Sequence, residues 1–446
     1  MKIIIIGAVA GGTTAAAKAR RNDKTAEIKI FEADQDISYA GCALPYYISN
    51  KITDRAEVVP RNAAFFKQKY NVDVYTGHRV LEIKPEEKML TIENLATQEV
   101  FNETYDKLLL STGAVSTMLP IEGSEKENVF ALRTVVNADK IRKFVLEANP
   151  KNVVIVGTGF IGMELAESFS ARGIQVTMVE LAPHVMPTLD SEMSEELEKY
   201  LREKKVTIVT GDSAAKFTGS PLVNKVILKS GRMLETDFVI MAGGIKPNVS
   251  LAQKAGVQLG STGAIQVNAK METSVEDIYA CGDCAESFSI ITGKPFYRPL
   301  GSTANKMGRV AGDQITGGDL EFQGGLGTGI FKVFDMAVAQ TGLTEKEALR
   351  EGYEVTVSHD RKPDKPEYYG GQDMLIKAVA DKKTGRVLGA QIIGPVGVDK
   401  RIDVFVTAIT FGAQAEDLAN LDLAYSPPFS TAKDPVIFTG MILGKG

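Results

Sequence analysis

The stretch "KNVVIVGTGFIGMELAESFSARGIQVTMVELA", residues 151–182, decides the fold of this chain. Its apolar, β-branched run at 151–156 predicts a buried parallel strand, and the run at 174–180 predicts a second one. The segment between them, to about residue 172, predicts a helix. Strand, helix and strand in this order form a βαβ unit.

A glycine-rich turn joins the first of these strands to the helix. Gly157, Gly159 and Gly162 form a G-x-G-x-x-G motif there, and Glu180 ends the second strand. The glycines permit a tight turn and close approach of a pyrophosphate, and the helix N-terminus supplies N–H donors. Glu180 can accept a hydrogen bond from a ribose 2′-hydroxyl but repels a 2′-phosphate. The alternative is a turn with incidental glycines, but four elements in register favour a dinucleotide site that prefers NADH.

The start of the chain repeats this unit. The strand "KIIIIG" runs into "GAVAGGTTAAAKARR", and the strand "EIKIFEAD" follows with Glu32 near its end. Val9 stands where the pattern has its middle glycine, so this copy is weaker by itself. Two such units in one chain indicate two domains of similar fold, each holding a nucleotide.

Three more apolar strands are expected between and after the two units. They lie in "YDKLLLSTGA" (105–114), "TDFVIMAGGIKPN" (236–248) and "EDIYACGDCAE" (276–286), and each runs into small residues that let backbone approach a ligand. Beyond residue 322 the pattern predicts two strands, a helix, a strand and a hairpin turned at Thr384-Gly385. This segment indicates an α+β domain.

Composition narrows the class of protein. The chain has 446 residues, 44% hydrophobic and 24% charged, which suits a globular protein of two or three domains. A net charge of −5 argues against broad binding to nucleic acid or to an anionic membrane, and no apolar run is long enough to span one. Three cysteines form no disulfide framework, so we expect a reducing cytoplasm.

These motifs together resemble the flavoprotein disulfide reductases that bind two dinucleotides. "YACGD" is similar to the family's second flavin motif, which assigns Asp283 to the ribityl chain, and "LLLSTGA" is similar to its Thr-Gly motif at Thr112 and Gly113. The resemblance implies an FAD domain at 1–113 and 247–322 that is split by an NAD(P)H domain at 114–246. It also implies a dimerisation domain at 323–446 and therefore a homodimer. The residues assigned to FAD and NAD(P)H are Gly7, Val9, Ala10, Gly11, Gly12, Glu32, Ala33, Cys42, Val80, Thr112, Gly113, Gly157, Gly159, Phe160, Ile161, Gly162, Glu164, Glu180, Gly244, Gly282, Asp283 and Ala304.

One cysteine distinguishes the branch within that family. Glutathione-reductase relatives carry two cysteines near the end of the first flavin unit, whereas only Cys42 is present here, in "ISYAGCALPYYIS" (37–49). The pattern Ser38-x-x-x-Cys42-x-x-Pro45-Tyr46 resembles the single-cysteine branch. That branch contains coenzyme A disulfide reductases, coenzyme A-dependent persulfide and polysulfide reductases, NADH oxidases and NADH peroxidases. The resemblance makes Cys42 and Ser38 catalytic residues.

A lone cysteine is half of a disulfide, so Cys42 needs a sulfur or oxygen from outside the chain. It can form a mixed disulfide with a small thiol such as coenzyme A, or a sulfenic acid. A helix that begins near Pro45 would stabilise its thiolate. The alternative is a buried structural cysteine, the commoner role. Cys281 and Cys284 form a C-x-x-C pair, but they coincide with the flavin motif, so a redox dithiol there is a minor alternative.

Coenzyme A contacts are predicted on the first helix. Thr14, Lys18 and Arg21 share one helix face, and the two cations can pair with phosphates, although a solvated face is the plain alternative. The resemblance favours ligand contacts there and extends them to Asn62, Phe66, Lys69 and Asn305. Ala10 replaces the histidine that peroxidases and many oxidases of the branch carry, which removes an acid/base group for peroxide.

C-terminal tyrosines complete the expected site. In the coenzyme A members of the branch such tyrosines reach the partner's cysteine, and Tyr425 matches one by its "AYSPPF" context. Tyr368 or Tyr369 matches the other. We therefore expect an NAD(P)H-dependent flavoenzyme that reduces coenzyme A disulfide, persulfide or polysulfide. The alternatives are an NADH oxidase that uses a Cys42 sulfenate, an electron-transfer flavoprotein reductase, and a nucleotide-responsive binding protein.

Overall fold

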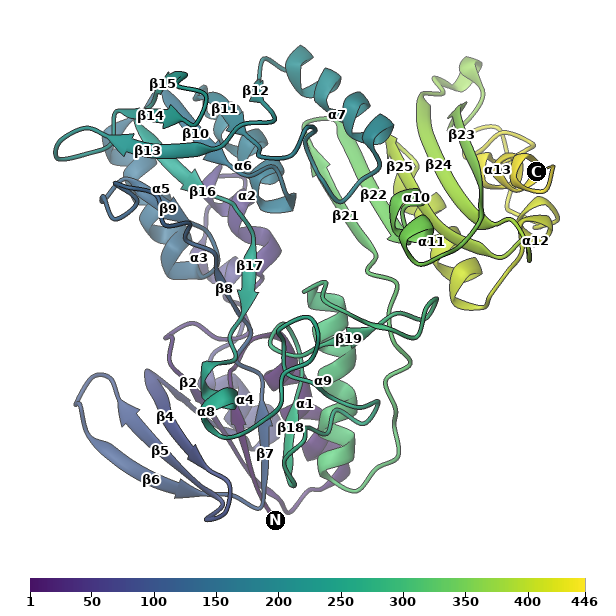
Figure 1. Ribbon diagram of the computed structural model, residues 1–446. Helices are drawn as coiled ribbons and strands as arrows, with labels where there is room; N and C mark the ends of the chain where they lie inside the picture. Colours follow the sequence, from purple (N-terminus) through teal and green to yellow (C-terminus); the bar gives the residue numbers. More distant parts are fainter. Residues whose placement is uncertain (446) are drawn as a thin grey trace.

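The computed structural model describes residues 1–445 and contains three sheet-based domains (Figure 1). Two domains are built on parallel sheets, and the third, at the C-terminal end of the chain, is built on an antiparallel sheet. The expected α/β class with an α+β C-terminal domain is confirmed. No helix in the described part of the chain is long and apolar enough to cross a membrane.

The first domain has a five-stranded parallel sheet in the order β18-β7-β1-β2-β3. Ile3, Ile4 and Ile5 of its central strand are completely buried, as expected of a parallel strand covered on both faces. A second, antiparallel sheet of β4, β5 and β6 packs beside it. The elements are β1 (Lys2–Ile6), β2 (Glu27–Glu32), β3 (Asp73–Thr76), β4 (His78–Lys84), β5 (Met89–Asn94), β6 (Val100–Thr104), β7 (Lys107–Leu110), β18 (Ile278–Ala280), β19 (Ser287–Phe288), β20 (Pro295–Phe296), α1 (Ala10–Asn22), α4 (Ala63–Tyr70), α8 (Ser250–Lys254) and α9 (Gly301–Ile315).

The second domain repeats the parallel sheet in the order β12-β11-β10-β16-β9. Its β10 and β11 are the two strands expected around the G-x-G-x-x-G motif. Strands β8 and β17 pair antiparallel and carry the chain between the first and second domains (Figure 1). The elements are β8 (Ala114–Ser116), β9 (Val129–Ala131), β10 (Asn152–Val156), β11 (Gln175–Val179), β12 (Thr207–Val209), β13 (Ala214–Thr218), β14 (Lys225–Leu228), β15 (Met233–Glu235), β16 (Phe238–Met241), β17 (Ile245–Pro247), α5 (Val135–Ala148), α6 (Phe160–Ser170) and α7 (Ser191–Glu203).

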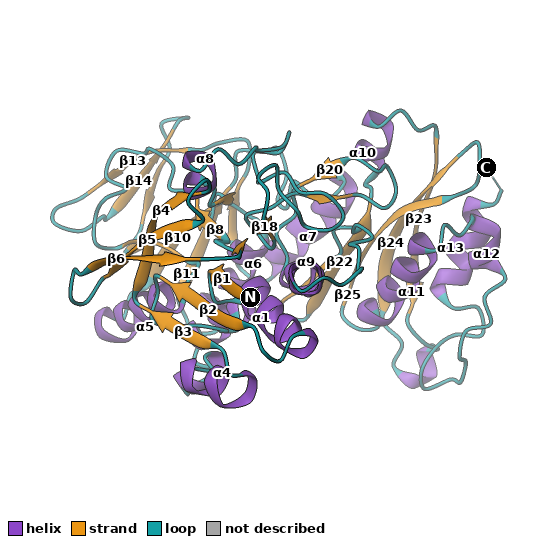
Figure 2. Cartoon of the chain, turned by 90° about the horizontal axis from the view of Figure 1, so that it is seen from below, coloured by secondary structure: helices purple, strands orange, loops and turns teal. Residues whose placement is uncertain are grey.

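The third domain has an antiparallel sheet in the order β21-β22-β25-β24-β23. Helices α11, α12 and α13 gather along it (Figure 2). The expected hairpin joins β24 to β25 across Thr384-Gly385. The elements are β21 (Gly329–Val333), β22 (Met336–Gly342), β23 (Val355–Pro363), β24 (Asp373–Asp381), β25 (Val387–Gly394), α10 (Glu345–Arg350), α11 (Val398–Thr410), α12 (Ala415–Ala419), α13 (Pro435–Leu443) and the 3₁₀ turn η2 (Glu367–Tyr369).

Two short N-terminal helices pack on the second domain rather than on the first. Helices α2 (Leu44–Ile48) and α3 (Arg55–Val58) lie beside α5 and α6 (Figure 1). Leu44, Tyr47 and Ile48 are buried in one apolar core with residues of these helices. The segment that follows Cys42 is therefore part of the packing of the second domain.

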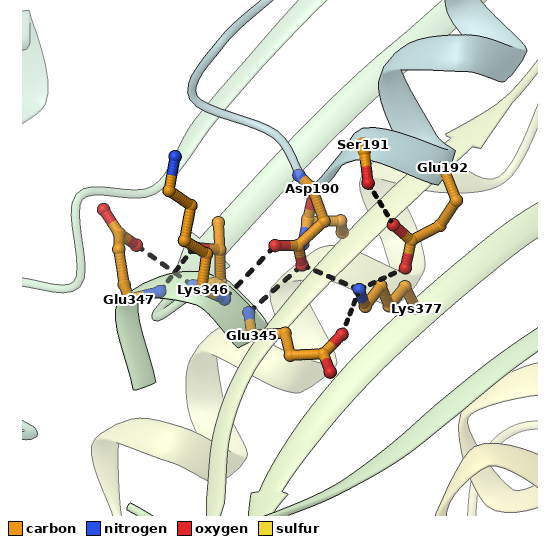
Figure 3. A network of polar contacts seen from close by, with 9 residues as sticks. Asp190, Ser191, Glu192, Glu345, Lys346, Glu347 and Lys377 are labelled. Carbon is orange, nitrogen blue, oxygen red and sulfur yellow. Dashed lines mark hydrogen bonds and ion pairs between the residues drawn. The ribbon is translucent and has the colours of Figure 1, made fainter. Parts of the chain in front are cut away.

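A buried lysine joins the second domain to the third (Figure 3). Lys377 of β24 is 1% exposed and contacts the carboxylates of Asp190, Glu192 and Glu345. Asp190 also accepts a hydrogen bond from the backbone N–H of Glu345 at 3.1 Å and from the side-chain amide of Gln391. Three carboxylates around one ammonium compensate the cost of burying it. This network fixes the loop before α7 against the third sheet.

Candidate active site

Three sequence motifs of the first domain meet at the carboxyl ends of β1, β7 and β18. These strands are parallel neighbours, so the turns that follow them lie together. A Cβ atom on Gly11 would lie 2.8 Å from Ser111 Oγ and 2.9 Å from Cys281 Sγ. Gly7 has a φ of +104°, and a Cβ there would collide with the Ser111 carbonyl oxygen. Only glycine fits these positions, and the motifs form one cradle.

The two glycine-rich units hold their acidic residues in the same way. The Glu32 carboxylate accepts hydrogen bonds from the backbone N–H groups of Ala8 at 2.8 Å and Asp34 at 2.9 Å. The Glu180 carboxylate accepts from the backbone N–H groups of Thr158 and Ala182, both at 3.0 Å. Each carboxylate is thus fixed beside its glycine loop, where a ribose would bind.

The open glycines of the second domain fit a bound dinucleotide. A Cβ on Gly159 or on Gly244 would meet no atom within 4 Å, so these positions face free space beside the loop. Phe160 and Ile161 begin α6 and are half-buried. The Phe160 ring packs on Phe331 of the third domain, with ring centroids 5.1 Å apart. Its side chain therefore serves a domain contact, which the sequence did not indicate.

Asp283 has a partner that the sequence reasoning missed. Arg133, which follows β9, places its guanidinium 2.6 Å from the Asp283 carboxylate and donates to the Ala114 carbonyl oxygen. Arg133 also lies close to Gly113, since a Cβ there would be 3.6 Å from its Nη2 atom. No short motif marks this arginine, and its partner is 150 positions away in the sequence. Arg133 joins the candidate site on geometry alone.

The remaining predicted cofactor positions line the same region less directly. A Cβ on Gly282 would lie 3.6 Å from the Cβ of Ala304 on α9. Thr112 donates its hydroxyl to the Asn248 carbonyl oxygen at 2.7 Å. The start of α1 holds Val9, Ala10 and Gly12, and the start of α6 holds Gly162. Ala33 is exposed after β2. Val80 packs on the core of the first domain.

Cys42 sits in a single 3₁₀ turn, η1 (Gly41–Ala43), directly before α2. The Ser168 hydroxyl of α6 donates to the Pro45 carbonyl oxygen at 2.9 Å, and Tyr47 donates to Asp139 of α5 at 3.0 Å. Ser38 has a φ of +48° and donates its backbone N–H to the Ala8 carbonyl oxygen at 2.8 Å. The Cys42 segment thus bridges the first glycine loop and the second domain.

The charged groups around Cys42 act on its thiol in opposite directions. A helix does begin at Leu44, with Pro45 in its first turn. Partial desolvation of the thiol and the nearby Glu164 carboxylate raise the pKa of Cys42, while Arg133 acts in the opposite direction. Burial among protein atoms and the Glu167 charge raise the pKa of Glu164 itself to about 7. Stabilisation of a Cys42 thiolate by this helix, which has only five residues, stays a prediction.

The C-x-x-C pair is part of the core. Cys281 and Cys284 are completely buried, and burial raises the pKa of both thiols. Both are unpaired, as is Cys42. A redox dithiol at this place has no access to a substrate. Cys42 is the exposed cysteine among the three.

Two of the predicted coenzyme A contacts on α1 meet residues of α9. The Thr14 hydroxyl donates to the Asn305 side-chain oxygen at 2.7 Å, so these two residues do meet. Lys18 is paired within the chain, because its ammonium lies 2.8 Å from the Asp313 carboxylate. Arg21 is exposed. Helix α1 therefore offers one paired and one exposed cation.

Helix α4 and its N-cap carry the other predicted coenzyme A contacts, Asn62, Phe66 and Lys69, and the prediction for Phe66 is wrong. Asn62 caps the helix by accepting from the Phe65 backbone N–H at 3.0 Å, and Lys69 is exposed. Phe66 is 3% exposed and packs in the core of the first domain, so a ligand cannot stack on it. The neighbouring Phe65 is half-buried, with Arg61 5.6 Å and Lys69 5.3 Å from its ring centroid. A run of two phenylalanines leaves open which one is buried, and the helix phase decides it.

The tyrosines expected at the site lie on surface loops of the third domain. Tyr368 and Tyr369 form part of η2, and Tyr368 is 74% exposed. Tyr425 is 53% exposed in the loop between α12 and α13. All three are available to contact a second chain.

Comparisons with known proteins identify the family of this chain. The model described as pyridine nucleotide-disulphide oxidoreductase matches residues 1–308, and the dimerisation domain of that family matches residues 329–435. "NAD(P)H coenzyme A polysulfide/persulfide reductase" of Pyrococcus horikoshii is 37% identical over 445 residues, which cover 99% of this chain and 98% of that protein. "NADH oxidase" of Methanocaldococcus jannaschii is 35% identical over 438 residues, which cover 98% of this chain and 97% of that protein.

A solved structure leads to the same conclusion. Reduced CoADR-RHD of Bacillus anthracis is 40% identical and superposes with a TM-score of 0.97, over 100% of this chain and 80% of that one. Both glycine loops lie within the first matched range, and the sheet of the third domain lies within the second. The chain belongs to the pyridine nucleotide-disulphide oxidoreductase family.

Proposed function

We propose that the protein uses NAD(P)H and FAD to reduce disulfides or persulfides of coenzyme A through Cys42. The single observation that carries this proposal is that Cys42 is exposed at the head of α2 while Cys281 and Cys284 are buried. A disulfide at Cys42 therefore requires a sulfur from outside the chain. The coenzyme A relative and the predicted contacts at Thr14 and Arg21 of α1 support coenzyme A as its source.

The two cradles fit the cofactors of the family. Glu32 and Gly7 would hold FAD in the first domain, and Glu180 and Gly159 would hold the nicotinamide nucleotide in the second. When bound, FAD supplies to the Cys42 sulfur the two electrons that NAD(P)H donates. The chain positions Cys42 by fixing η1 between both cradles.

The sulfur chemistry balances with one cysteine. The Cys42 thiolate attacks one sulfur of coenzyme A disulfide, the S–S bond breaks, and one coenzyme A leaves as thiolate. Two electrons then break the Cys42–coenzyme A disulfide and release the second coenzyme A and the Cys42 thiolate. The sum is NAD(P)H, one proton and one disulfide giving NAD(P)⁺ and two thiols. With coenzyme A persulfide, the first leaving group is hydrosulfide.

Replacement of Cys42 tests this function. Cys42→Ser should retain FAD but lose reduction of coenzyme A disulfide by about 100-fold or more, since the nucleophile is gone. The control is Cys281→Ser combined with Cys284→Ser, which should keep turnover wherever FAD stays bound. Near wild-type activity of Cys42→Ser would contradict the proposal. The intact mass under non-reducing conditions should show an adduct of the size of coenzyme A that dithiothreitol removes.

Oxygen reduction is the second candidate, because the NADH oxidase relative is similar over nearly the whole chain. A Cys42 sulfenic acid would be its intermediate. Ala10 at the start of α1 supplies no acid or base there. Oxygen uptake with NADH alone that exceeds the rate with coenzyme A disulfide would favour the oxidase.

We also propose that NADH is preferred over NADPH. The Glu180 carboxylate is held at its glycine loop by Thr158, which also donates its hydroxyl at 2.6 Å, so it cannot easily turn away from a 2′-phosphate. In Glu180→Ala, KM for NADH should rise. The ratio of KM for NADPH to KM for NADH should fall by about ten-fold, because one like-charge contact with the 2′-phosphate is lost. Measured KM values for both nucleotides decide this, and a lower KM of the wild type for NADPH would contradict it.

The third domain is the proposed homodimer interface, as its family match suggests. We propose the cytoplasm as the compartment, since all three cysteines are free thiols.

A further inference from the structure

A buried arginine lies under both tyrosine-bearing loops of the third domain. Arg401 of α11 is 1% exposed. Its guanidinium donates to the Asp434 carboxylate at 2.9 Å and to the Asp364 backbone carbonyl oxygen at 2.8 Å. It also donates to the Ser430 hydroxyl and to the Gly397 carbonyl oxygen, both at 3.3 Å. We call Arg401, Asp434, Ser430 and Asp364 the arginine clasp.

Each end of the clasp continues into one loop. The Asp364 backbone N–H donates to the Gln372 carbonyl oxygen at 2.9 Å, and the Gln372 backbone N–H donates to the Asp364 carboxylate at 2.8 Å. These two bonds close the stem of the loop that holds Tyr368 and Tyr369. Inside this loop the Tyr369 backbone N–H donates to the Pro366 carbonyl oxygen at 3.0 Å. The loop is therefore folded on itself above Asp364.

The other end anchors the loop of Tyr425. Ser430 donates its hydroxyl to Asp434 at 2.7 Å and its backbone N–H to the Ser426 carbonyl oxygen at 3.1 Å. Asp434 also caps α13 by accepting from the Val436 backbone N–H at 3.0 Å. Tyr425 directly precedes the turn that Ser430 closes. One guanidinium thus fixes the relative positions of the two loops.

Apolar packing does not explain this arrangement. A buried ion pair is weak evidence for stability, because well-packed apolar residues often replace one at no loss. The planar guanidinium offers donors in a fixed fork, so it can reach acceptors on two loops at once. The rings above it are exposed, and Phe429 beside them is exposed as well. The clasp therefore fixes two loops whose aromatic side chains are exposed to solvent.

We propose that Arg401 is a positioning residue that holds Tyr425 and the Tyr368–Tyr369 pair for the sulfur step at Cys42 of the partner subunit. This inference rests on the proposed function, and it takes the role of the tyrosines from the resemblance to the coenzyme A members of the family. It adds a residue that touches neither substrate nor cofactor and acts through both loops.

The test compares Arg401→Met with Lys377→Met. Lys377 is equally buried in the same domain, but its partners Asp190, Glu192 and Glu345 lie outside both tyrosine loops. Both variants remove one buried cation, so a general loss of stability affects both. Arg401→Lys is the milder variant, because it keeps a charge beside Asp434 but cannot span both loops.

Amide hydrogen exchange of the FAD-bound dimer is the first readout. Peptides that cover residues 364–372 and 425–434 should exchange about ten-fold faster than in the wild type in Arg401→Met and Arg401→Lys. The same peptides should exchange at the wild-type rate in Lys377→Met. Equal exchange in all proteins overturns the proposal, whatever the substrate is. This readout does not depend on coenzyme A, so it separates the clasp from the proposed function.

Half-reactions are the second readout. Arg401→Met should slow reoxidation of the reduced enzyme by coenzyme A disulfide by about ten- to 100-fold, because small displacements of catalytic groups have effects of that size. Reduction of the flavin by NADH should stay within about two-fold of wild type. In a chain that carries Tyr425→Phe, Tyr368→Phe and Tyr369→Phe, Arg401→Met should cause no further slowing.

The outcomes divide clearly. Faster exchange with an unchanged reoxidation rate overturns the catalytic role of the clasp, and so does equal slowing of both half-reactions. Further slowing in the triple phenylalanine chain also overturns it, since Arg401 would then act without the tyrosines. If neither coenzyme A disulfide nor coenzyme A persulfide reoxidises the wild type, the proposed function fails, while the exchange result still tests the clasp itself.

Discussion

Two charged side chains act on the Cys42 thiol in opposite directions. Glu164 of α6 raises its pKa and Arg133 lowers it. Glu164 comes from the second domain, and Arg133 contacts Asp283 of the first. The reactivity of the cysteine therefore depends on residues that the chain brings in from three distant segments.

Removal of the Glu164 charge should make Cys42 more reactive. In Glu164→Gln the pKa of Cys42 falls, so alkylation by iodoacetamide should be about two- to five-fold faster, the effect of one partly screened charge. Because the pKa of Glu164 is about 7, the difference should develop above that pH and vanish as the pH falls below it. It should also disappear at high pH, once Cys42 is fully ionised in both proteins. Alkylation rates of the FAD-bound, dithiothreitol-reduced protein, followed by mass across pH, provide the measurement. Arg133→Met should shift the rate the other way, and equal rates for wild type and Glu164→Gln would contradict the prediction.

At the scale of elements, α1 and α9 pack closely beside the predicted coenzyme A contacts. A Cβ on Gly308 would collide with the Gly11 carbonyl oxygen, and one on Gly312 with that of Ala15. The two backbones therefore approach closely, which lets Asp313 of α9 reach Lys18 of α1. This contact and the hydrogen bond to Asn22 lower the pKa of Asp313 to about 2.

Lys18 and Arg21 should therefore respond differently to truncation. Arg21→Ala should raise KM for coenzyme A disulfide, at a cost of about 1.5–3 kcal/mol for a charge-assisted contact, and leave the Tm unchanged. Lys18→Ala should lower the Tm because it leaves the Asp313 carboxylate with fewer partners. Because the pKa of Asp313 is lower in the folded chain than in the unfolded one, its ionised carboxylate stabilises the fold at pH values above the ordinary pKa of an aspartate. This stabilisation is lost as the pH falls towards about 2, so the Tm difference between the wild type and Lys18→Ala should shrink there. An unchanged KM in Arg21→Ala would mean that this helix face is a solvated surface that does not contact coenzyme A.

The sequence predicted elements better than it predicted contacts between them. The βαβ units could be predicted because strands of consecutive isoleucine and valine and a spaced glycine motif are local signals. The pairs Arg133–Asp283 and Lys18–Asp313 could not, since each joins residues that only the fold brings together. Phe66 was a wrong prediction because the phase of a short helix, and not composition, decides which ring faces the core.

At the scale of the whole molecule, the residues of the proposed reaction are spread over all three domains. The Cys42 segment packs on the second domain, and Tyr425 lies on an exposed loop of the third. Tyr425 is 53% exposed in a loop with two prolines, so part of its side chain is free to contact a second chain. We propose a shared site, with Cys42 from one chain and Tyr425 from the other, formed through the dimerisation domain that matches residues 329–435.

Heterodimers test the shared site quantitatively. Cys42→Ser and Tyr425→Phe chains with different affinity tags are co-expressed, and the mixed dimer is isolated. If the site is shared, one of its two sites combines an intact Cys42 with an intact Tyr425, so the dimer should have about half the wild-type activity. The Cys42→Ser homodimer should be inactive, and the Tyr425→Phe homodimer should be slower by about ten- to 100-fold if the phenol supplies a proton.

The converse heterodimer is the control, with Cys42→Ser and Tyr425→Phe in one chain and a wild-type partner. In a shared site its remaining Cys42 faces Phe at position 425, so it should show only about half the activity of the Tyr425→Phe homodimer. If each chain works alone, the two heterodimers should exchange these values, because the wild-type chain of the control would then hold a complete site. The order of the two activities therefore decides whether Tyr425 acts across the interface, provided that the Tyr425→Phe homodimer is slower than the wild type.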